Sequence, residues 1–337
     1  MKLKSFSFLI SASFIAVLIM GALGAEWIAP YPPDQEIRNH SYHPPTAIHF
    51  FDRDGRFSFR PFIYTTKPAY DLNLRRLYPE ETSTKYFLKL GWRKFISVEA
   101  ADGEASGKPG FYLLGTDSRG RDLFSRILYG ARLSLSMALL GASLAGLAGL
   151  VIGGASGYFG GKADAFLMRI TEFFIMIPGL YLLLALRSAL PPELPSRQVY
   201  ALIVVILGLI GWGSVARVIR GMALAIRERD FVLAAKVLGR SDIEILMRHI
   251  FPHTLSYLGI VISISIPGYI LGESALSLLG LGIQDPDISW GNLLPESLAI
   301  AHLRFHPWIV APAVFIMATS LCFNRLGDVL KTRVELS

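Results

Sequence analysis

The sequence has a single cysteine, Cys322, which excludes an internal disulfide and a metal cluster built from cysteines. Charged residues are also scarce, at 18%, against 52% hydrophobic residues and a mean hydropathy of +0.45. Soluble domains average roughly 45–50% apolar only when glycine is counted as well. A soluble fold therefore offers too little interior for the apolar side chains of this chain.

Patterns for nucleotide binding and catalysis are also lacking. The nearest approach to a phosphate-binding loop, Gly160-Gly161-Lys162-Ala163, has Ser156 at the position of the first glycine and no Ser or Thr after the lysine. The net charge of +7 comes from Lys and Arg scattered through loops, without a nucleic-acid-reading motif. No catalytic or metal-binding spacing emerges. The absence of these motifs disfavours an enzyme and predicts no cofactor, no metal and no nucleic-acid partner.

Apolar blocks close to the bilayer-spanning length of roughly 20 residues dominate the chain instead. They lie at 6–28, 133–157, 165–186, 199–219, 255–280 and 307–323. These blocks predict an all-α polytopic membrane protein with six transmembrane helices. The first block ends in Ala22-Leu23-Gly24-Ala25, as a cleaved secretory signal would. Its apolar region exceeds the roughly 7–15 residues usual for such signals, so we favour an uncleaved anchor.

Basic residues in the shorter connections predict the orientation. Seven Lys and Arg surround the connection between the fourth and fifth blocks, against two after the third block and one after the fifth. The positive-inside rule therefore makes the loop 220–253 cytoplasmic, and six spans put both termini on the same side. The long segment 29–114 then faces outward. We expect it to form a small, irregular α/β lobe between the first two helices.

The second block carries small residues at every fourth position, which form a flat ridge where another helix can approach closely. The ridge consists of Gly141, Ala145, Gly149 and Gly153. We interpret it as tight packing within one subunit. Pro178 and Pro267 are expected to kink the third and fifth blocks.

An ion-coupled carrier usually keeps paired ionisable residues deep in the membrane. Arg169 and Glu172 lie three residues apart near the cytoplasmic end of the third block, and we interpret them as an interfacial ion pair. Glu273, toward the outer end of the fifth block, equally suits a hydrogen bond to a neighbouring helix. An ion-coupled secondary transporter and a membrane-anchored enzyme remain as alternatives to a transporter driven by a separate ATPase.

The cytoplasmic loop predicts a helix–turn–helix. Asp230 is placed to cap the first helix, and Gly239 to end it in the left-handed conformation. Ser241 and Glu244 form a capping box for the second helix, which is expected to end at Pro252. One face of that helix is expected to hold Ile243, Leu246, Met247 and Ile250.

Two stretches of the sequence resemble motifs of one transporter family. The stretch from Gly115 to Leu135 resembles the signature before the second span of the C-type subunit in dipeptide/oligopeptide/nickel-type ABC importer permeases. Its signature residues are Gly115, Thr116, Asp117, Gly120, Arg121, Asp122 and Arg132. The stretch 231–252 resembles the EAA loop by which such permeases engage their ATPases, and Leu233 stands where that loop often has glutamate. Its matching residues include Ala234, Ala235, Gly239, Ile250 and Pro252.

The resemblance covers about two thirds of the chain, residues 115–328, and implies an ABC type I importer permease core there. Residues 1–28 would be the N-terminal anchor, 29–114 the external segment and 329–337 a cytoplasmic tail. The resemblance implies an inner-membrane heterodimer with a second permease, two ATPase subunits that bind the ATP, and an external binding protein. The implied solute is a peptide, with nickel chelates or other small solutes as alternatives.

Overall fold

The computed structural model describes residues 2–72, 76–91, 96–100, 110–189, 191 and 194–336, without the side chains of 2–6, 90, 96–100 and 333–336. The chain divides into two compact units. Unit 1 comprises Met1–Ile15, Ser134–Gln284 and Ile316–Ser337, and unit 2 comprises Ala16–Leu133 and Asp285–Phe315. Helices α1, α3 and α11 contribute residues to both units, so each unit is described by itself.

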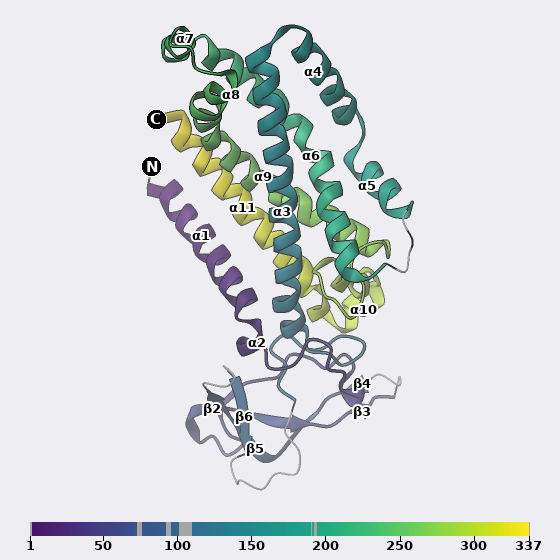
Figure 1. The fold of residues 1–337 in the computed structure, drawn as a ribbon. Coiled ribbons are helices and arrows are strands. Elements are labelled where there is room, and N and C mark those ends of the chain that lie inside the picture. Colours follow the sequence, from purple (N-terminus) through teal and green to yellow (C-terminus); the bar gives the residue numbers. More distant parts are fainter. Residues whose placement is uncertain are drawn as a thin grey trace. The chain divides into compact units, whose positions relative to one another are not determined.

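Unit 1 is helical (Figure 1). Its long helices, with those shared with unit 2, are α1 (Lys2–Leu23), α3 (Leu123–Phe159), α4 (Gly161–Met176), α5 (Gly179–Ser188), α6 (Ser196–Arg227), α9 (Phe251–Leu278) and α11 (Ala311–Leu336). Helix α6 packs against α4, α5 and α9. Its buried face, which includes Ile203, Val215 and Ile219, therefore lies at the centre of this unit.

Four continuous helical segments among the described residues are long and apolar enough to cross a bilayer. They are Leu123–Phe159, Ser196–Arg227, Asp242–Leu278 and Pro307–Thr332. Helices α4 and α5 add a fifth if the pair counts as one span, and Ser7–Leu23 is a shorter apolar helix. The predicted helical membrane protein is thus confirmed with four or five spans, while the sixth stays a prediction.

The two prolines of the predicted spans have different effects. Helices α4 and α5 meet at 83°, with Ile177 and Pro178 both in extended conformation between them. Proline disfavours the helical conformation of the residue before it, so the third block is broken there rather than gently kinked. Pro267 is buried inside α9, which continues through it as one helix.

The described part of the 29–114 segment is mostly strand. A four-stranded antiparallel sheet has the order β1-β2-β5-β6, and β3 pairs with β4. The strands are β1 (His49–Phe51), β2 (Phe57–Thr66), β3 (Ala69–Tyr70), β4 (Arg76–Leu77), β5 (Glu80–Leu90) and β6 (Ile96–Ala100). Between residues 29 and 114, the only helix among the described residues is the 3-10 turn η1 (Arg38–His40). In its described residues, the predicted α/β lobe therefore consists of strands with this one helical turn.

Aromatic and β-branched residues explain why this segment forms strands, since such side chains pack well on a pleated, half-buried surface. Phe62 in β2 is fully buried and lies opposite Phe87 in β5. Ile63, Tyr86 and Phe111 form a second small core. The short helix α2 (Ala25–Ile28) precedes this lobe in the chain.

Residues 285–315 complete unit 2 with short helical turns. They are η3 (Gly291–Leu293), η4 (Pro295–Leu298), α10 (Ile300–Phe305) and η5 (Pro307–Val310). Ile288 and Leu293 pack against Leu123 at the start of α3. The indole N–H of the fully buried Trp290 donates to the backbone oxygen of Ile127 over 2.9 Å. This segment is thereby fixed to the first turns of α3.

Candidate coupling loop and signature loop

The first arm of the loop 220–253, α7 (Asp230–Val237), is terminated by Gly239, whose φ is +76°. Glycine takes this left-handed conformation without the steric penalty of a Cβ. The N–H of Arg240 bonds to the oxygen of Ala235, and that of Gly239 to the oxygen of Lys236, over 3.1 and 3.0 Å. This is the paired bonding of a Schellman end, which satisfies carbonyls at the helix terminus. The predicted role of Gly239 in the backbone is observed.

Capping at the helix starts agrees with the prediction only in part. Arg229, not Asp230, is the N-cap of α7, and no side chain caps it. Asp230 lies in the first turn, where a negative charge is favourable to the helix dipole. At α8 (Asp242–Ile245) the Ser241 hydroxyl does accept the N–H of Glu244, over 3.3 Å. The Glu244 carboxylate pairs with Arg240 and Arg248 of the same loop, at 2.6 and 3.1 Å.

The second arm does not end at Pro252. Helix α8 passes through the π-helical turn η2 (Leu246–Ile250) directly into α9, and Pro252 lies in the first turn of α9. Proline is tolerated there because the N–H groups of a first helical turn have no partner within the helix. The predicted stop was therefore wrong, and the arm is continuous with a membrane-spanning helix.

The π-helical turn also changes which side chains are buried. Ile245 and Ile250, five residues apart, are both fully buried, matching the i to i+5 spacing of a π-helix. Ile243 and Met247 are 73% and 60% exposed. The face predicted from ordinary α-helical spacing was therefore wrong for these two residues and right for Leu246 and Ile250.

Both arms of the loop pack on the end of α3. The shared core consists of Tyr158, Ala223, Val232, Ala235, Ile245, Leu246 and Ile250. The Tyr158 hydroxyl donates to the carboxylate of Asp242 over 2.6 Å, and the Lys236 ammonium lies 5.0 Å from the centroid of the Tyr158 ring. One side chain of α3 thus contacts both α7 and α8.

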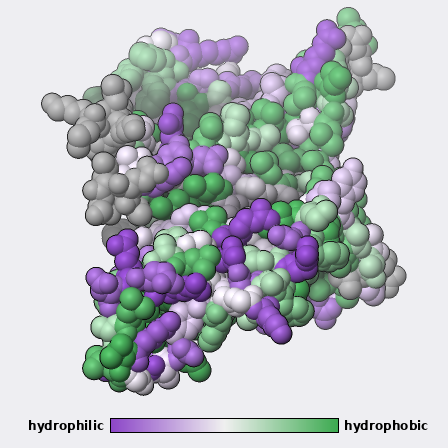
Figure 2. Space-filling view, turned by 90° about the horizontal axis from the view of Figure 1, so that it is seen from above, coloured by the Kyte–Doolittle hydropathy of each residue, from purple (hydrophilic) through white to green (hydrophobic). Residues whose placement is uncertain are grey.

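A set of apolar side chains on the loop is exposed, and we name it the loop surface. It consists of Phe231, Leu233, Val237, Leu238, Ile243 and Met247. Val237 is 88% exposed and Leu233 is 44% exposed. Ala234 is also exposed, whereas its neighbour Ala235 is buried. Figure 2, seen from the end where α7 lies, shows hydrophobic and hydrophilic residues next to each other. Exposed apolar patches rimmed by polar residues mark interaction sites.

Two arginines of α6 form hydrogen bonds to neighbouring helices, one to α4 and one to the end of α3. The guanidinium of Arg220 donates two hydrogen bonds to the carboxylate of Asp164 in α4, over 2.5 and 2.6 Å. Arg227 donates to the backbone oxygen of Gly157 over 3.2 Å. From the sequence alone these arginines contribute only to the positive charge near the loop 220–253, because Asp164 and Gly157 lie far away in the chain.

The small-residue ridge of α3 faces α6 within unit 1. A Cβ added at Gly149 would lie 2.5 Å from the Cβ of Val215, and one at Gly153 would meet the backbone of Ala216. At Gly141 the nearest atom would be the Leu207 Cβ, at 3.1 Å. Ala145 is 2% exposed in a core with Trp212 and Ala216. The two backbones are therefore close along several turns.

The ionisable residues considered for ion coupling have ordinary contacts. Arg169 and Glu172 are 3.9 Å apart on exposed side chains, consistent with an interfacial ion pair. Glu273 is buried in α9 and accepts a hydrogen bond from the Ser277 hydroxyl over 2.7 Å. Among the described residues, no group of three or more His, Cys, Asp or Glu could hold a metal ion.

In unit 2, the signature residues form a tight loop before α3. Gly115 and Gly120 both have positive φ, at +77° and +74°, and a Cβ at Gly120 would collide with the backbone oxygen of Ile37. The carboxylate of Asp117 accepts the N–H groups of Arg119 and Arg121, each over 2.9 Å. It also accepts the Nε–H of Arg121 over 2.7 Å.

Two signature side chains fix this loop to its surroundings. Asp122 caps α3, because its carboxylate accepts both the N–H and the hydroxyl of Ser125 over 2.8 and 2.5 Å. Burial raises the pKa of Asp122 to about 6 in spite of these bonds. The fully buried Thr116 hydroxyl accepts the N–H of His43 and donates to the oxygen of His40, over 2.7 and 2.5 Å.

Asp285 joins the signature loop to the 285–315 segment. Its carboxylate accepts from Arg121 and Arg126 over 3.0 and 3.2 Å, and Arg119 lies 3.5 Å away. Burial acts to raise the pKa of Asp285, but Arg121 and Arg126 lower it further than burial raises it. No local pattern indicates this partner, since Asp285 lies 159 residues from Arg126 in the chain.

Arg132 binds the end of α1. Its guanidinium donates to the backbone oxygens of Ala22 and Leu23, the latter over 2.7 Å, and pairs with Glu26 at 3.2 Å. A cation at this position satisfies terminal carbonyls and suits the negative end of the helix dipole. The signature residues described so far thus have structural contacts within unit 2.

Apolar helices of bilayer-spanning length define a polytopic membrane protein, and one of its helical loops exposes a set of apolar side chains. Comparison with known proteins gives the family. Residues 147–336 match the family of binding-protein-dependent transport system inner membrane components. The chain belongs to this family, and it is therefore a membrane component of an ABC importer, which works with ATPase and substrate-binding partners.

Relatives of known function share about two thirds of the chain. The oligopeptide transport system permease protein OppC of Haemophilus influenzae is 37% identical over 67% of this chain and 70% of its own length. The dipeptide transport system permease protein DppC of Bacillus subtilis is 37% identical over 66% of this chain and 67% of its own. Among solved structures, an inward-facing form of the MetNI methionine ABC transporter matches 61% of this chain and 96% of its own, with 15% identity and a TM-score of 0.44.

Proposed function

We propose that this chain forms half of the translocation path of a peptide importer. A second, similar permease forms the other half, two cytoplasmic ATPase subunits hydrolyse ATP, and an external binding protein delivers the peptide. The peptide as solute is supported by the relatives, which are peptide transport permeases of several bacteria. Family membership supports the partner classes, and the pairing and stoichiometry are our proposal.

The loop surface is the observation that carries the coupling role. Its exposed apolar side chains lie on two helical arms that are held by Tyr158 of α3. An ATPase groove that closes on this surface would bury those side chains, and its movement would be passed to α3 and, through the continuous second arm, to α9. ATP-driven closure of the ATPases would then rock the permeases between inward- and outward-open states.

The proposed orientation places the loop 220–253 and both termini in the cytoplasm, with the tail 329–337 among them. It rests on the positive-inside count, and it puts the 29–114 lobe outside the cell membrane. The lobe is then positioned to receive the binding protein. Its sheet and its hydrogen bonds to the signature loop give it a defined fold for that contact.

Uptake by the reconstituted complex tests the function. The chain, its partner permease, the two ATPases and the binding protein are placed in liposomes, and uptake of radiolabelled trialanine is measured with and without ATP. We expect uptake that requires both ATP and binding protein. A complex that takes up a nickel chelate but no trialanine would contradict the proposed solute, and uptake driven by an ion gradient without ATP would contradict the mechanism.

A further inference from the structure

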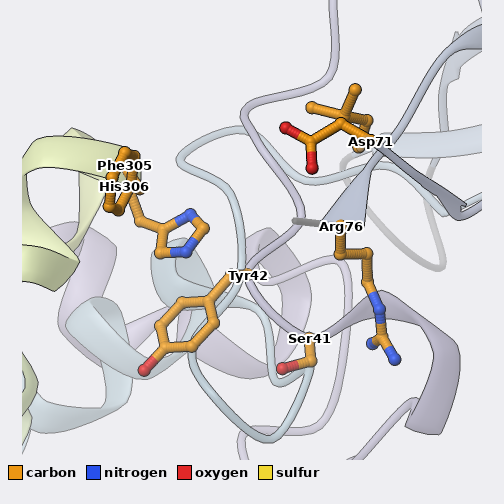
Figure 3. A pocket seen from close by; sticks show the side chains of 7 residues that line it. Ser41, Tyr42, Asp71, Arg76, Phe305 and His306 are labelled. Atoms are coloured by element: carbon orange, nitrogen blue, oxygen red, sulfur yellow. The ribbon is translucent and has the colours of Figure 1, made fainter. Parts of the chain in front are cut away.

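Unit 2 contains a cavity of about 440 Å³, which we name the lobe cavity. It is lined by Ser41, Tyr42, Asp71, Arg76, Leu77, Phe305 and His306. These residues come from three separate parts of the chain: the segment before the sheet, the β3–β4 pair and the end of α10. Figure 3 shows Asp71 and Arg76 on one side of the cavity, and Tyr42 and His306 on the other. The volume lies in the range of roughly 300–1,000 Å³ that is usual for small-molecule sites.

The aromatic side of the lobe cavity is a pair of stacked rings held in place by hydrogen bonds. The rings of Tyr42 and His306 stack with centroids 4.3 Å apart and planes 3° from parallel. The Tyr42 hydroxyl lies 3.3 Å from Nδ1 of His302. The backbone N–H of Tyr42 donates to the backbone oxygen of Asp117 over 2.9 Å. Burial and the neighbouring His302 lower the pKa of His306, so this wall is uncharged at neutral pH.

Two features of this wall are unfavourable to folding. Tyr42 has a φ of +53°, which makes it the one non-glycine residue with positive φ in the described part of the chain. Nδ1 of His306 is buried without a hydrogen-bond partner among the described residues. Strained backbone and unsatisfied polar atoms persist at sites that are shaped for binding rather than for stability. Both features border the same cavity.

The polar side of the lobe cavity carries one charge of each sign. Nε and Nη2 of Arg76 donate to the Tyr70 hydroxyl over 3.3 and 2.9 Å, which holds the guanidinium in place. Hydrogen bonds to Tyr70 and Tyr78 raise the pKa of Arg76 and keep it charged. A guanidinium matches a carboxylate through two parallel hydrogen bonds. The Asp71 carboxylate, a few residues earlier in the chain, is the opposite charge in the same lining.

We propose that the lobe cavity binds short zwitterionic peptides, with Arg76 pairing with the peptide carboxylate and Asp71 with its ammonium. The stacked rings of Tyr42 and His306 provide an aromatic surface against which peptide side chains pack. A simple anion would be repelled by Asp71, and a neutral sugar could hydrogen-bond to both side chains but would form an ion pair with neither. The inference rests on the proposed peptide import and adds a contact site for the solute outside the helical core.

The test measures binding of trialanine to the complete permease–ATPase complex in nanodiscs, without the binding protein. Calorimetry compares trialanine with its N-acetyl and C-amide derivatives, on the wild type and on the variants Arg76→Gln and Asp71→Asn. The matched controls are Lys67→Gln, whose exposed side chain pairs with Glu81, and Asp54→Asn on the exposed β1–β2 turn. Both control residues lie outside the lining of the cavity.

We expect Arg76→Gln to weaken trialanine binding at least about tenfold while leaving binding of the C-amide unchanged. Asp71→Asn should weaken trialanine similarly and leave the N-acetyl derivative unchanged. Both controls should bind as the wild type does. Wild-type affinity in both cavity variants, or no saturable binding of trialanine to the wild type, overturns the proposal.

The uptake assay separates this inference from the proposed function. If the complex imports trialanine but the cavity variants bind it normally, peptide import stands and the lobe cavity is not a peptide site. If the variants show the expected losses but the complex imports no peptide, the binding site stands and the proposed solute is wrong.

Discussion

The hydroxyl of Tyr158 donates a 2.6 Å hydrogen bond to the carboxylate of Asp242, which joins the end of α3 to the first residue of α8. The same ring lies 5.0 Å below the ammonium of Lys236 in α7. Because both arms of the proposed coupling loop meet at this one side chain, we expect a displacement of either arm to act on α3. The relationship makes Tyr158 the natural place to interrupt coupling without removing the loop.

The variant Tyr158→Phe keeps the buried ring and removes the hydrogen bond to Asp242. A hydrogen bond to a charged group is worth about 1.5–3 kcal/mol, and its loss should loosen α8 on α3. We expect normal assembly but a several-fold lower stimulation of ATP hydrolysis by the loaded binding protein. Tyr181→Phe, at a side chain that is 72% exposed, is the control. Full stimulation in Tyr158→Phe would show that this bond does not contribute to coupling.

The variant Gly239→Val tests the angle between the two arms. A Cβ at Gly239 would meet nothing within 4 Å, so any effect must come from the backbone, whose φ is +76°. A β-branched residue is strained there, whereas asparagine tolerates the left-handed region. We expect the valine variant to insert and pair normally but to lose substrate-stimulated ATP hydrolysis and transport. Gly239→Asn should retain most of both, and equal activity of the two variants would refute the backbone argument.

The variant Gly149→Leu tests the contact between α3 and α6. Its side chain would have to enter the space of Val215 and the backbone oxygen of Trp212. Overpacking of this kind costs typically about 1–3 kcal/mol. The melting temperature of the detergent-solubilised subunit should fall, and assembly should suffer more than surface expression. The control is Gly259→Leu in α9, where a Cβ meets nothing within 4 Å. It should change neither the melting temperature nor assembly.

Several local signals in the sequence predicted local parts of this structure, whereas Asp230 and Pro252 are not the predicted cap and stop. Apolar block length predicted the helices, and Gly239 and Ser241 predicted the turn and cap that the loop has. These features depend on a few neighbouring residues, so a sequence window contains the whole of their physical cause.

Features that depend on distant residues, or on the wider spacing of a π-helical turn, were not predicted. The π-helical turn at Leu246–Ile250 spaces the buried residues Ile245 and Ile250 five apart, and Ile243 and Met247, which were expected on the same face as Ile250, are exposed. The partners of Tyr158 and Arg126 lie 84 and 159 residues away. Long-range pairing of this kind leaves no periodic pattern in the chain.

The variant Asp285→Asn tests the link between the signature loop and the 285–315 segment. It removes the charge that Arg121 and the 2%-exposed side chain of Arg126 share. Breaking a buried pair by removing one partner costs about 3–5 kcal/mol, and the 38% exposure of the Asp285 side chain reduces this figure. We expect a lower melting temperature at pH 7. Asp287→Asn, two residues later, is the control, and an unchanged melt for Asp285→Asn would rule out this stabilising role.

The pH dependence of Asp122→Asn should be opposite in sign to that of Asp285→Asn. The pKa of Asp122 is raised by burial to about 6 in the folded protein, against about 3.9 in an unfolded chain. Between these two pKa values Asp122 is protonated in the folded state and ionised in the unfolded state. Its contribution to the free energy of unfolding is therefore fully present below about pH 4 and is lost as the pH rises through about 6. The asparagine keeps an oxygen to accept the N–H of Ser125, and it removes the cost of burying the charge.

Asp122→Asn should therefore melt at a higher temperature than the wild type at pH 7, and the difference should shrink toward zero as the pH approaches 4. For Asp285 the folded pKa is lowered, so its carboxylate stabilises the fold above its unfolded pKa and that contribution disappears as the pH falls through the folded pKa. The melting temperature of Asp285→Asn should accordingly stay below that of the wild type from pH 7 down to about pH 4. Melting curves of the two variants and the wild type, recorded every half unit from about pH 4 to 7, measure both trends. If Asp122→Asn melts below the wild type at pH 7, its ionised carboxylate is a net stabilising cap of α3, and burial does not dominate its energetics.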